Sequence, residues 1–154
     1  MSSQGTHTKE LAISIIFASL YVALIVVFQS VSFLGLQVRV ANCLLALIPL
    51  FAMPSVYGIT LGVFVGNLLS PFGVFDLLSI IPTFIGAVLI LKIKSNILGL
   101  LIYNLIIGTW LTVVFGIPLG VPTILLYVGL SVANIGIGYP LYSGLKRWKG
   151  INGC

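Results

Sequence analysis

Two charged side chains lie in stretches of the sequence that are otherwise apolar. Arg39 is the only arginine before Arg147 near the C-terminus, and Asp76 is the only acidic residue besides Glu10. A charged group is costly to place among apolar neighbours, so an ionisable residue in such a stretch points first to a function. We therefore take Arg39 and Asp76 as the starting point for a candidate binding site.

Each of these two residues has more than one interpretation. Arg39 can extend to the membrane surface, form an ion pair with Asp76 that joins two loops, or bind an anionic group; we favour the ion pair. Asp76 can accept hydrogen bonds from the first backbone N–H groups of a helix, which is a structural role. Alternatively, its carboxylate can accept hydrogen bonds from the amine or amidine-like edge of a ligand.

Four asparagines in the apolar part of the chain add neutral donors and acceptors. Their simplest role is hydrogen bonding between helices, worth about 0.6–2 kcal/mol per contact. If the amides converge, they can instead recognise the polar edge of a heterocycle, with Tyr21, Tyr57, Tyr103, Tyr127 or Trp110 as stacking surface. The candidate substrate-binding residues are Arg39, Asn42, Asn67, Asp76, Asn104 and Asn134.

Several kinds of chemistry have no matching motif. The single histidine, His7, lies in a polar segment, and Cys43 and Cys154 have no metal-ligand spacing. The sequence has no phosphate-binding glycine loop, no nucleophile with a histidine partner and no pair of carboxylates in the apolar region. We predict a protein that is not an enzyme and that has no metal and no cofactor. Any ATP hydrolysis must come from partner subunits.

The composition indicates an integral membrane protein. Of 154 residues, 60% are hydrophobic and 6% are charged, and the mean hydropathy is +1.27, whereas soluble domains contain about 25% charged residues. The apolar runs are continuous, as in transmembrane helices, and do not alternate as in barrel strands. The few basic residues lie at segment ends, so we expect contact with membrane lipid and no nucleic-acid partner.

We predict an all-α fold, a six-helix transmembrane bundle. Prolines at 49 and 54 predict that the second helix kinks or ends early, and Pro82 predicts a kink in the fourth. Gly58, Gly62 and Gly66 share one helix face and predict close helix packing. The expected helices are at about 11–32, 41–53, 55–69, 76–93, 96–115 and 123–145, within one membrane domain at 11–148 that follows a disordered cytoplasmic tail at 1–10.

The basic residues also predict the orientation of the chain. Lys92 and Lys94 end the fourth helix, and Lys146, Arg147 and Lys149 end the sixth. Basic residues mark the cytoplasmic side, so both termini are expected to be cytoplasmic in a multi-pass protein of the cell membrane. Arg39 and Asp76 then lie at the outer face.

Two sequence runs resemble those of a known family. Gln37-Val38-Arg39-Val40-Ala41-Asn42 is the first, and the second extends from Gly62-Val63-Phe64-Val65-Gly66-Asn67-Leu68-Leu69-Ser70-Pro71-Phe72-Gly73 through Val74-Phe75-Asp76-Leu77. These runs, with Asn104, residues 126–130 and Pro140, are similar to the queuosine-precursor transporter (QueT) family, whose members are S components of energy-coupling factor (ECF) transporters. The resemblance covers about residues 11–147.

The resemblance implies that the chain has the fold of an S component. It also implies that the protein takes up a queuosine precursor, a 7-deazaguanine, or a similar heterocyclic micronutrient at its outer face. It further implies a transmembrane coupling subunit and two ATPase subunits. Small residues of the first helix would meet the coupling subunit: Ser14, Ala18, Ser19 and Ala23. The chain departs from the family pattern in lacking an acid at Asn42 and another near Leu130 and Ser131, which makes a neutral ligand at least as plausible as a cationic one.

Two other functions remain open at this point. A stand-alone channel or facilitator would need a polar path that only the asparagines and Asp76 could line. A membrane-embedded enzyme would need catalytic groups for which the sequence has no motif. Co-purification with ATPases separates an S component from a channel, and substrate turnover by the isolated chain would indicate an enzyme.

Overall fold

The computed structural model describes residues 3–28, 39–70, 74–148 and 150, and all regular secondary structure in these ranges is helical. This agrees with the predicted all-α class. In chain order the elements are α1 (Ser3–Val27), the 3-10 helix η1 (Val40–Leu47), α3 (Ile48–Asn67), α4 (Val74–Leu77), α5 (Ile80–Lys92), α6 (Asn96–Val114), α7 (Val121–Ser131), the π-helix η2 (Val132–Ile137) and α8 (Gly138–Trp148).

The first helix begins earlier than the sequence predicts. The expected disordered tail at 1–10 is wrong for its described part, because α1 already starts at Ser3. Residues 6–10 remain exposed, so their polar side chains stay accessible to solvent while the backbone is helical. His7 Nδ1 lies 3.7 Å from Glu10 Oε2 one turn further on, a spacing that supports a helix. The expected helix end near residue 32 falls outside the described residues.

The predicted break between the second and third helices occurs at Ala52. This residue has φ 56° and ψ −150°, which interrupts the helical run from Val40 to Asn67. Pro49 lies in the first turn of α3, where a missing backbone N–H costs no hydrogen bond. Pro54 follows the break by two residues, as expected for a residue that cannot extend the preceding helix.

The predicted fourth helix is wrong in one respect. The sequence predicts a single helix kinked at Pro82, but the chain forms α4, makes a turn at Leu78 and Ser79, and starts α5 at Ile80. Pro82 therefore lies in the first turn of α5 and causes no kink there. The fifth helix matches its prediction within a residue, and the sixth is continuous from α7 through η2 to α8.

Four helical runs in the described residues are long and apolar enough to cross a membrane. They are Thr6–Val27, Val40–Asn67, Asn96–Val114 and Val121–Trp148, and Ile80–Lys92 is a shorter apolar helix. A helix of about 20 residues spans the hydrocarbon core. The count of six spanning helices remains a prediction.

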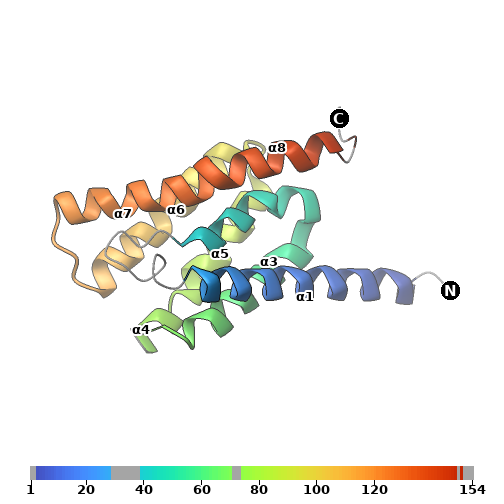
Figure 1. Ribbon diagram of the computed structural model, residues 1–154, viewed down its shortest axis with the longest axis horizontal. Helices are drawn as coiled ribbons and strands as arrows, with labels where there is room; N and C mark the ends of the chain where they lie inside the picture. Colours follow the sequence, from blue (N-terminus) through green and yellow to red (C-terminus); the bar gives the residue numbers. More distant parts are fainter. Residues whose placement is uncertain (1–2, 29–38, 71–73, 149, 151–154) are drawn as a thin grey trace.

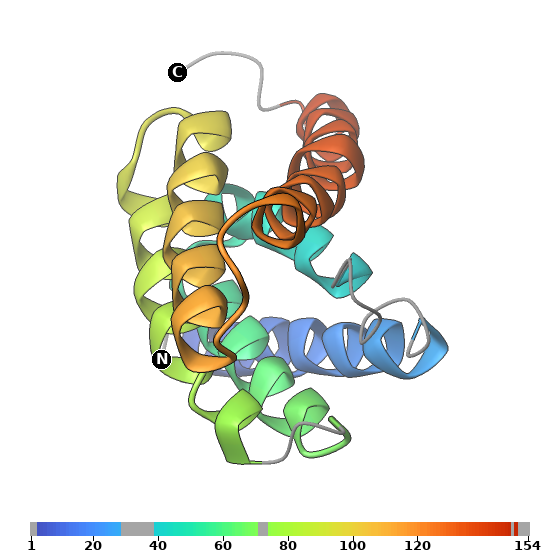
Figure 2. The ribbon, with the colours of Figure 1, turned by 90° about the vertical axis from the view of Figure 1, so that its left-hand side faces the viewer.

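The α7–α8 run follows the long axis of the molecule, and α1, α5 and α6 are tilted from it (Figures 1 and 2). The start of α1 and the end of α8 lie at one end of the molecule, and α4 lies at the other (Figure 1). In Figure 2, which looks along the molecule from the α4 end, the α5–α6 pair, the α7–α8 run and the α1–α3 pair are arranged around η1. Residues 41–47 of η1 are all buried, as this central position requires.

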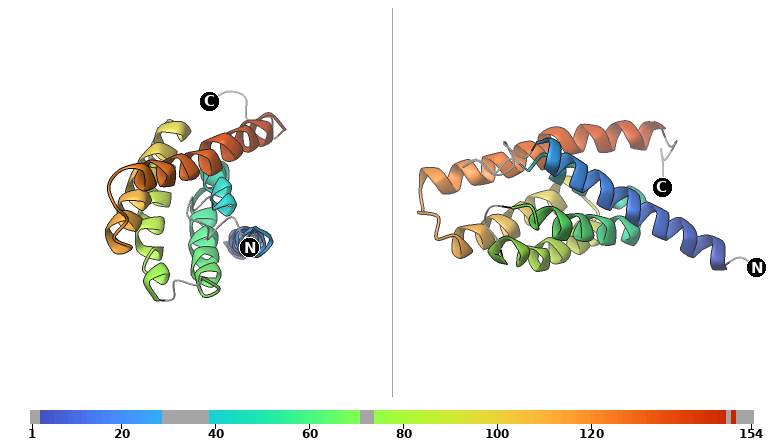
Figure 3. Two further views of the ribbon diagram at one scale, coloured as in Figure 1. Left: turned by 60° about the vertical axis from the view of Figure 1, so that its left-hand side comes forward. Right: turned by 60° about the horizontal axis from the view of Figure 1, so that its bottom comes forward.

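Glycines bring α3 into direct contact with α1, which is seen nearly end-on beside α3 in the left view of Figure 3. A Cβ atom added to Gly62 would lie 2.6 Å from the Cβ of Tyr21, and one added to Gly58 would collide with the backbone oxygen of Ser14. Gly66 packs in the same way on the side chain of Ile25. The predicted glycine packing face is thus confirmed, and its partner is α1.

The outer surface of the bundle is apolar. Leu119 is 88% exposed and Val113 is 74% exposed, and many other large hydrophobic residues of the described chain are exposed on every long helix. A surface of this kind is unfavourable in water and favourable against lipid chains. The fold therefore fits a membrane protein.

Replacing Gly62 with alanine is expected to lower the free energy of unfolding by about 1–3 kcal/mol, because the new methyl group would overlap Tyr21. The measurement is thermal unfolding of the purified protein in detergent. Gly144→Ala is the matched control, since a Cβ at Gly144 has no atom within 4 Å. Equal stability of the two variants would contradict close packing at Gly62.

Candidate ligand site

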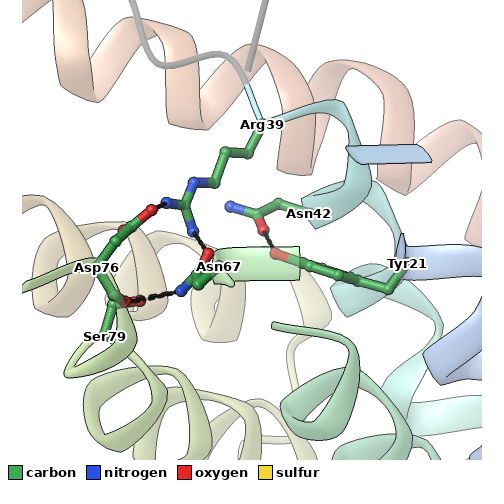
Figure 4. A network of polar contacts seen from close by, with 6 residues as sticks. All are labelled: Tyr21, Arg39, Asn42, Asn67, Asp76 and Ser79. Carbon is green, nitrogen blue, oxygen red and sulfur yellow. Dashed lines mark hydrogen bonds and ion pairs between the residues drawn. The ribbon is translucent and has the colours of Figure 1, made fainter. Parts of the chain in front are cut away.

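Arg39 and Asp76 form a buried ion pair. Arg39 directly precedes η1, Asp76 lies on α4, and the guanidinium Nη2 donates to Asp76 Oδ1 at 2.6 Å and to Oδ2 at 2.7 Å (Figure 4). Arg39 is 8% exposed and Asp76 is 1% exposed. The ion pair favoured from the sequence is therefore present, and it holds together two segments 37 residues apart.

Asn67 links this ion pair to the start of α5. Its side-chain oxygen accepts a hydrogen bond from Arg39 Nη1 at 3.2 Å, and its amide nitrogen donates to the backbone oxygen of Asp76 at 2.7 Å and to Ser79 Oγ at 2.9 Å. The Ser79 hydroxyl in turn donates to the same Asp76 oxygen at 2.7 Å. These contacts satisfy the backbone where the chain leaves α4 and explain why the helix breaks before Pro82.

Asn42 lies on the other side of Arg39 and bonds to α1. The Tyr21 hydroxyl donates to Asn42 Oδ1 at 2.7 Å, and both side chains are buried. In Figure 4 the amide nitrogen of Asn42 is turned toward the Arg39 side of the network. This nitrogen is a neutral donor close to the ion pair.

We call Tyr21, Arg39, Asn42, Asn67, Asp76 and Ser79 the polar cluster. Its formal charge is zero, because the positive charge of Arg39 is balanced by Asp76. Burial alone would lower the pKa of the Arg39 guanidinium, but the attraction and hydrogen bonds of Asp76, with a contribution from Tyr21, outweigh it and raise that pKa. The arginine therefore stays charged.

The side-chain amides of Asn104 and Asn134 are hydrogen-bonded to each other. The amide nitrogen of Asn134 in η2 donates to Asn104 Oδ1 in α6, and Asn104 Nδ2 donates to Ser131 Oγ at 3.2 Å. Both asparagines are buried, and Asn134 Oδ1 has no hydrogen-bond partner among the residues that the structure describes. These contacts match the alternative in which the amides join helices.

The small residues of α1 fall in two places. Ala18, Ser19 and Ala23 line an open groove of about 450 Å³ together with Val22, Leu61 and Val65. Ser14 instead lies at the contact of α1 with α3, where its hydroxyl donates to the backbone oxygen of Pro54 at 2.8 Å.

Sequence reasoning missed two members of the polar cluster. The sequence suggests stacking alone for Tyr21, and Ser79 is not among the candidate residues. A hydroxyl in the middle of an apolar helix is a signal that a hydrogen-bond partner is needed, but the partner cannot be read from the sequence. In the part of the chain that the structure describes, no three His, Cys, Asp or Glu residues lie together as metal ligands would.

A comparison with models of protein families identifies the family of this chain. The family model of the QueT transporter matches residues 11–147. The chain belongs to the QueT transporter family. It is thus a membrane transporter, and the resemblance inferred from the sequence is confirmed. Comparisons with curated proteins and with solved structures gave no match.

Removing one partner of the ion pair in this QueT protein is expected to destabilise the fold. Arg39→Gln and Asp76→Asn should each lower the free energy of unfolding by about 3–5 kcal/mol, because each leaves a buried charge without its counter-ion. The double variant should be more stable than either single variant, since it carries no buried charge. Unfolding in detergent measures all three, and additive losses would contradict the coupling.

Proposed function

We propose that this QueT protein is the substrate-binding S component of an ECF-type transporter and that it takes up a queuosine precursor, a 7-deazaguanine, or a similar heterocycle. The polar cluster is the observation that carries the proposal. A buried ion pair often stabilises a protein less than well-packed apolar residues would. Its presence in an apolar bundle is therefore explained better by a function than by stability.

The chemistry of the polar cluster suits a purine-like ligand. Asn42 offers an amide donor, Tyr21 offers hydroxyl lone pairs, and Arg39 and Asp76 add strong polar groups within the same region. A small number of converging polar groups in an apolar surround is typical of small-molecule sites. We include Asn104 and Asn134 as further ligand contacts, with Asn134 Oδ1, which has no partner in the described part of the chain, as the acceptor.

We propose that the polar cluster faces the outside of the cell membrane. Lys92, Lys146 and Arg147 lie in the last turns of α5 and α8, and basic residues favour the cytoplasmic side. With both termini on that side, a multi-pass chain has α4 at the outer end, because α4 lies away from the termini (Figure 1). A ligand would then be captured from outside.

Energy for uptake would come from partners. The sequence has no phosphate-binding loop, so we propose a transmembrane coupling subunit and two ATPase subunits. The groove lined by Ala18, Ser19 and Ala23 is the proposed contact with the coupling subunit, because small side chains allow a helix of another chain to approach closely.

Mass spectrometry of small molecules released from the purified protein tests the substrate, followed by calorimetric titration with 7-deazaguanines. Asn42→Leu is expected to weaken binding several-fold to about tenfold, since it removes a hydrogen bond to the ligand. Asn96→Leu is the control, because it removes another buried amide whose bond goes to the Ala46 backbone. Tight binding that Asn42→Leu leaves unchanged would exclude the polar cluster as the site.

Ala18→Trp is expected to abolish co-purification with the ATPase subunits while ligand affinity stays within about twofold. The indole would fill the groove that the coupling subunit needs. Val113→Trp is the control, because Val113 is 74% exposed on α6 and lies outside this groove. Uptake by the chain alone in vesicles, without any ATPase, would instead support a stand-alone facilitator.

A further inference from the structure

The ion pair determines which charge a ligand can carry. Resting on the proposed function, we infer that this chain selects an uncharged 7-deazaguanine, such as one with a nitrile at position 7, over the aminomethyl derivative, which is a cation. The inference concerns the polar cluster and follows from how Asp76 is used.

The charge of the Asp76 carboxylate is already balanced by Arg39. Both of its carboxylate oxygens accept from Arg39 Nη2, and the side chain is 1% exposed. The sequence between Leu11 and Leu91 contains no other acidic residue. A ligand ammonium group would need this carboxylate, and it would have to displace the guanidinium to reach it.

Displacing Arg39 would leave its guanidinium without a counter-ion in the same buried region as the bound cation. The guanidinium is held from two sides, because Nη1 donates to Asn67 while Nη2 donates to Asp76. Asn67 is itself fixed by Ser79 and by the backbone oxygen of Asp76. Binding a cation would therefore disturb the whole polar cluster and bring two positive charges together in a low-dielectric environment.

A neutral ligand has no such cost. The amide nitrogen of Asn42 and the hydroxyl of Tyr21 are uncharged groups beside the ion pair. They can bond to the ring edge or to a neutral substituent while Arg39 and Asp76 stay paired. The side chain at position 42 is a neutral amide, so it provides no carboxylate that would balance a cation.

Calorimetric titration with three ligands of one ring system tests the inference. The 7-cyano, 7-hydroxymethyl and 7-aminomethyl derivatives of 7-deazaguanine share the ring, and the last two have nearly the same size. The full chain in detergent at neutral pH should bind both neutral ligands at least tenfold more tightly than the aminomethyl cation. Similar affinity for the hydroxymethyl and aminomethyl ligands, or a preference for the cation, overturns the inference.

A series of variants in which the charges of the ion pair are removed gives a second test. Arg39→Gln releases the Asp76 carboxylate, so the preference should shift at least tenfold toward the aminomethyl ligand. Adding Asp76→Asn to that variant removes the carboxylate and should restore the preference for neutral ligands. An unchanged preference in Arg39→Gln overturns the inference.

Failure of the proposed function gives a different result. In that case none of the three ligands binds the folded wild-type chain. If Arg39→Gln does not fold, the comparison of hydroxymethyl and aminomethyl ligands on the wild-type protein decides the inference, since it needs no variant.

Discussion

The buried ion pair between Arg39 and Asp76 is the constraint on which the α4 end of the molecule depends. It joins the start of η1 to α4, and through Asn67 it also holds the end of α3 and the start of α5. A guanidinium and a carboxylate in an apolar bundle are tolerated only when they neutralise each other and their remaining hydrogen-bonding atoms find partners. The break between α4 and α5 is the local consequence, because it brings Asp76 and Ser79 to Asn67.

The rest of the bundle is held by close approach of helices. Gly58 and Gly62 let α3 touch α1, Gly86 packs on Tyr103, and Gly138 packs on the backbone of Cys43. In lipid there is little hydrophobic force between helices, so tight van der Waals packing of this kind supplies the association. The apolar outer surface and the buried polar cluster therefore belong to one arrangement, in which the ion pair and the groups that bond to it are kept away from lipid.

In the function that we propose, the charge balance of the interior determines which ligands bind. The one acid of the polar cluster is already paired with Arg39, and we infer that such a site favours ligands that need no counter-ion. The groove on α1 is also distinct from the polar cluster: the Tyr21 hydroxyl bonds to Asn42, while Ala18, Ser19 and Ala23 line the open groove. One helix can thus serve ligand binding on one face and a partner subunit on the other.

The amino-acid sequence alone determined the membrane class, the helical fold and the glycine face, and it favoured the ion pair over two other roles of Arg39. Composition and apolar runs are local properties, and Arg39 had only one acid within the apolar region to pair with. Only the tertiary structure decided that Tyr21 bonds Asn42, that Ser79 joins Asn67, and that Asn104 and Asn134 use their amides on each other. Those contacts depend on how each helix is rotated about its axis, and that rotation is set by packing between segments far apart in the chain, which no local pattern records.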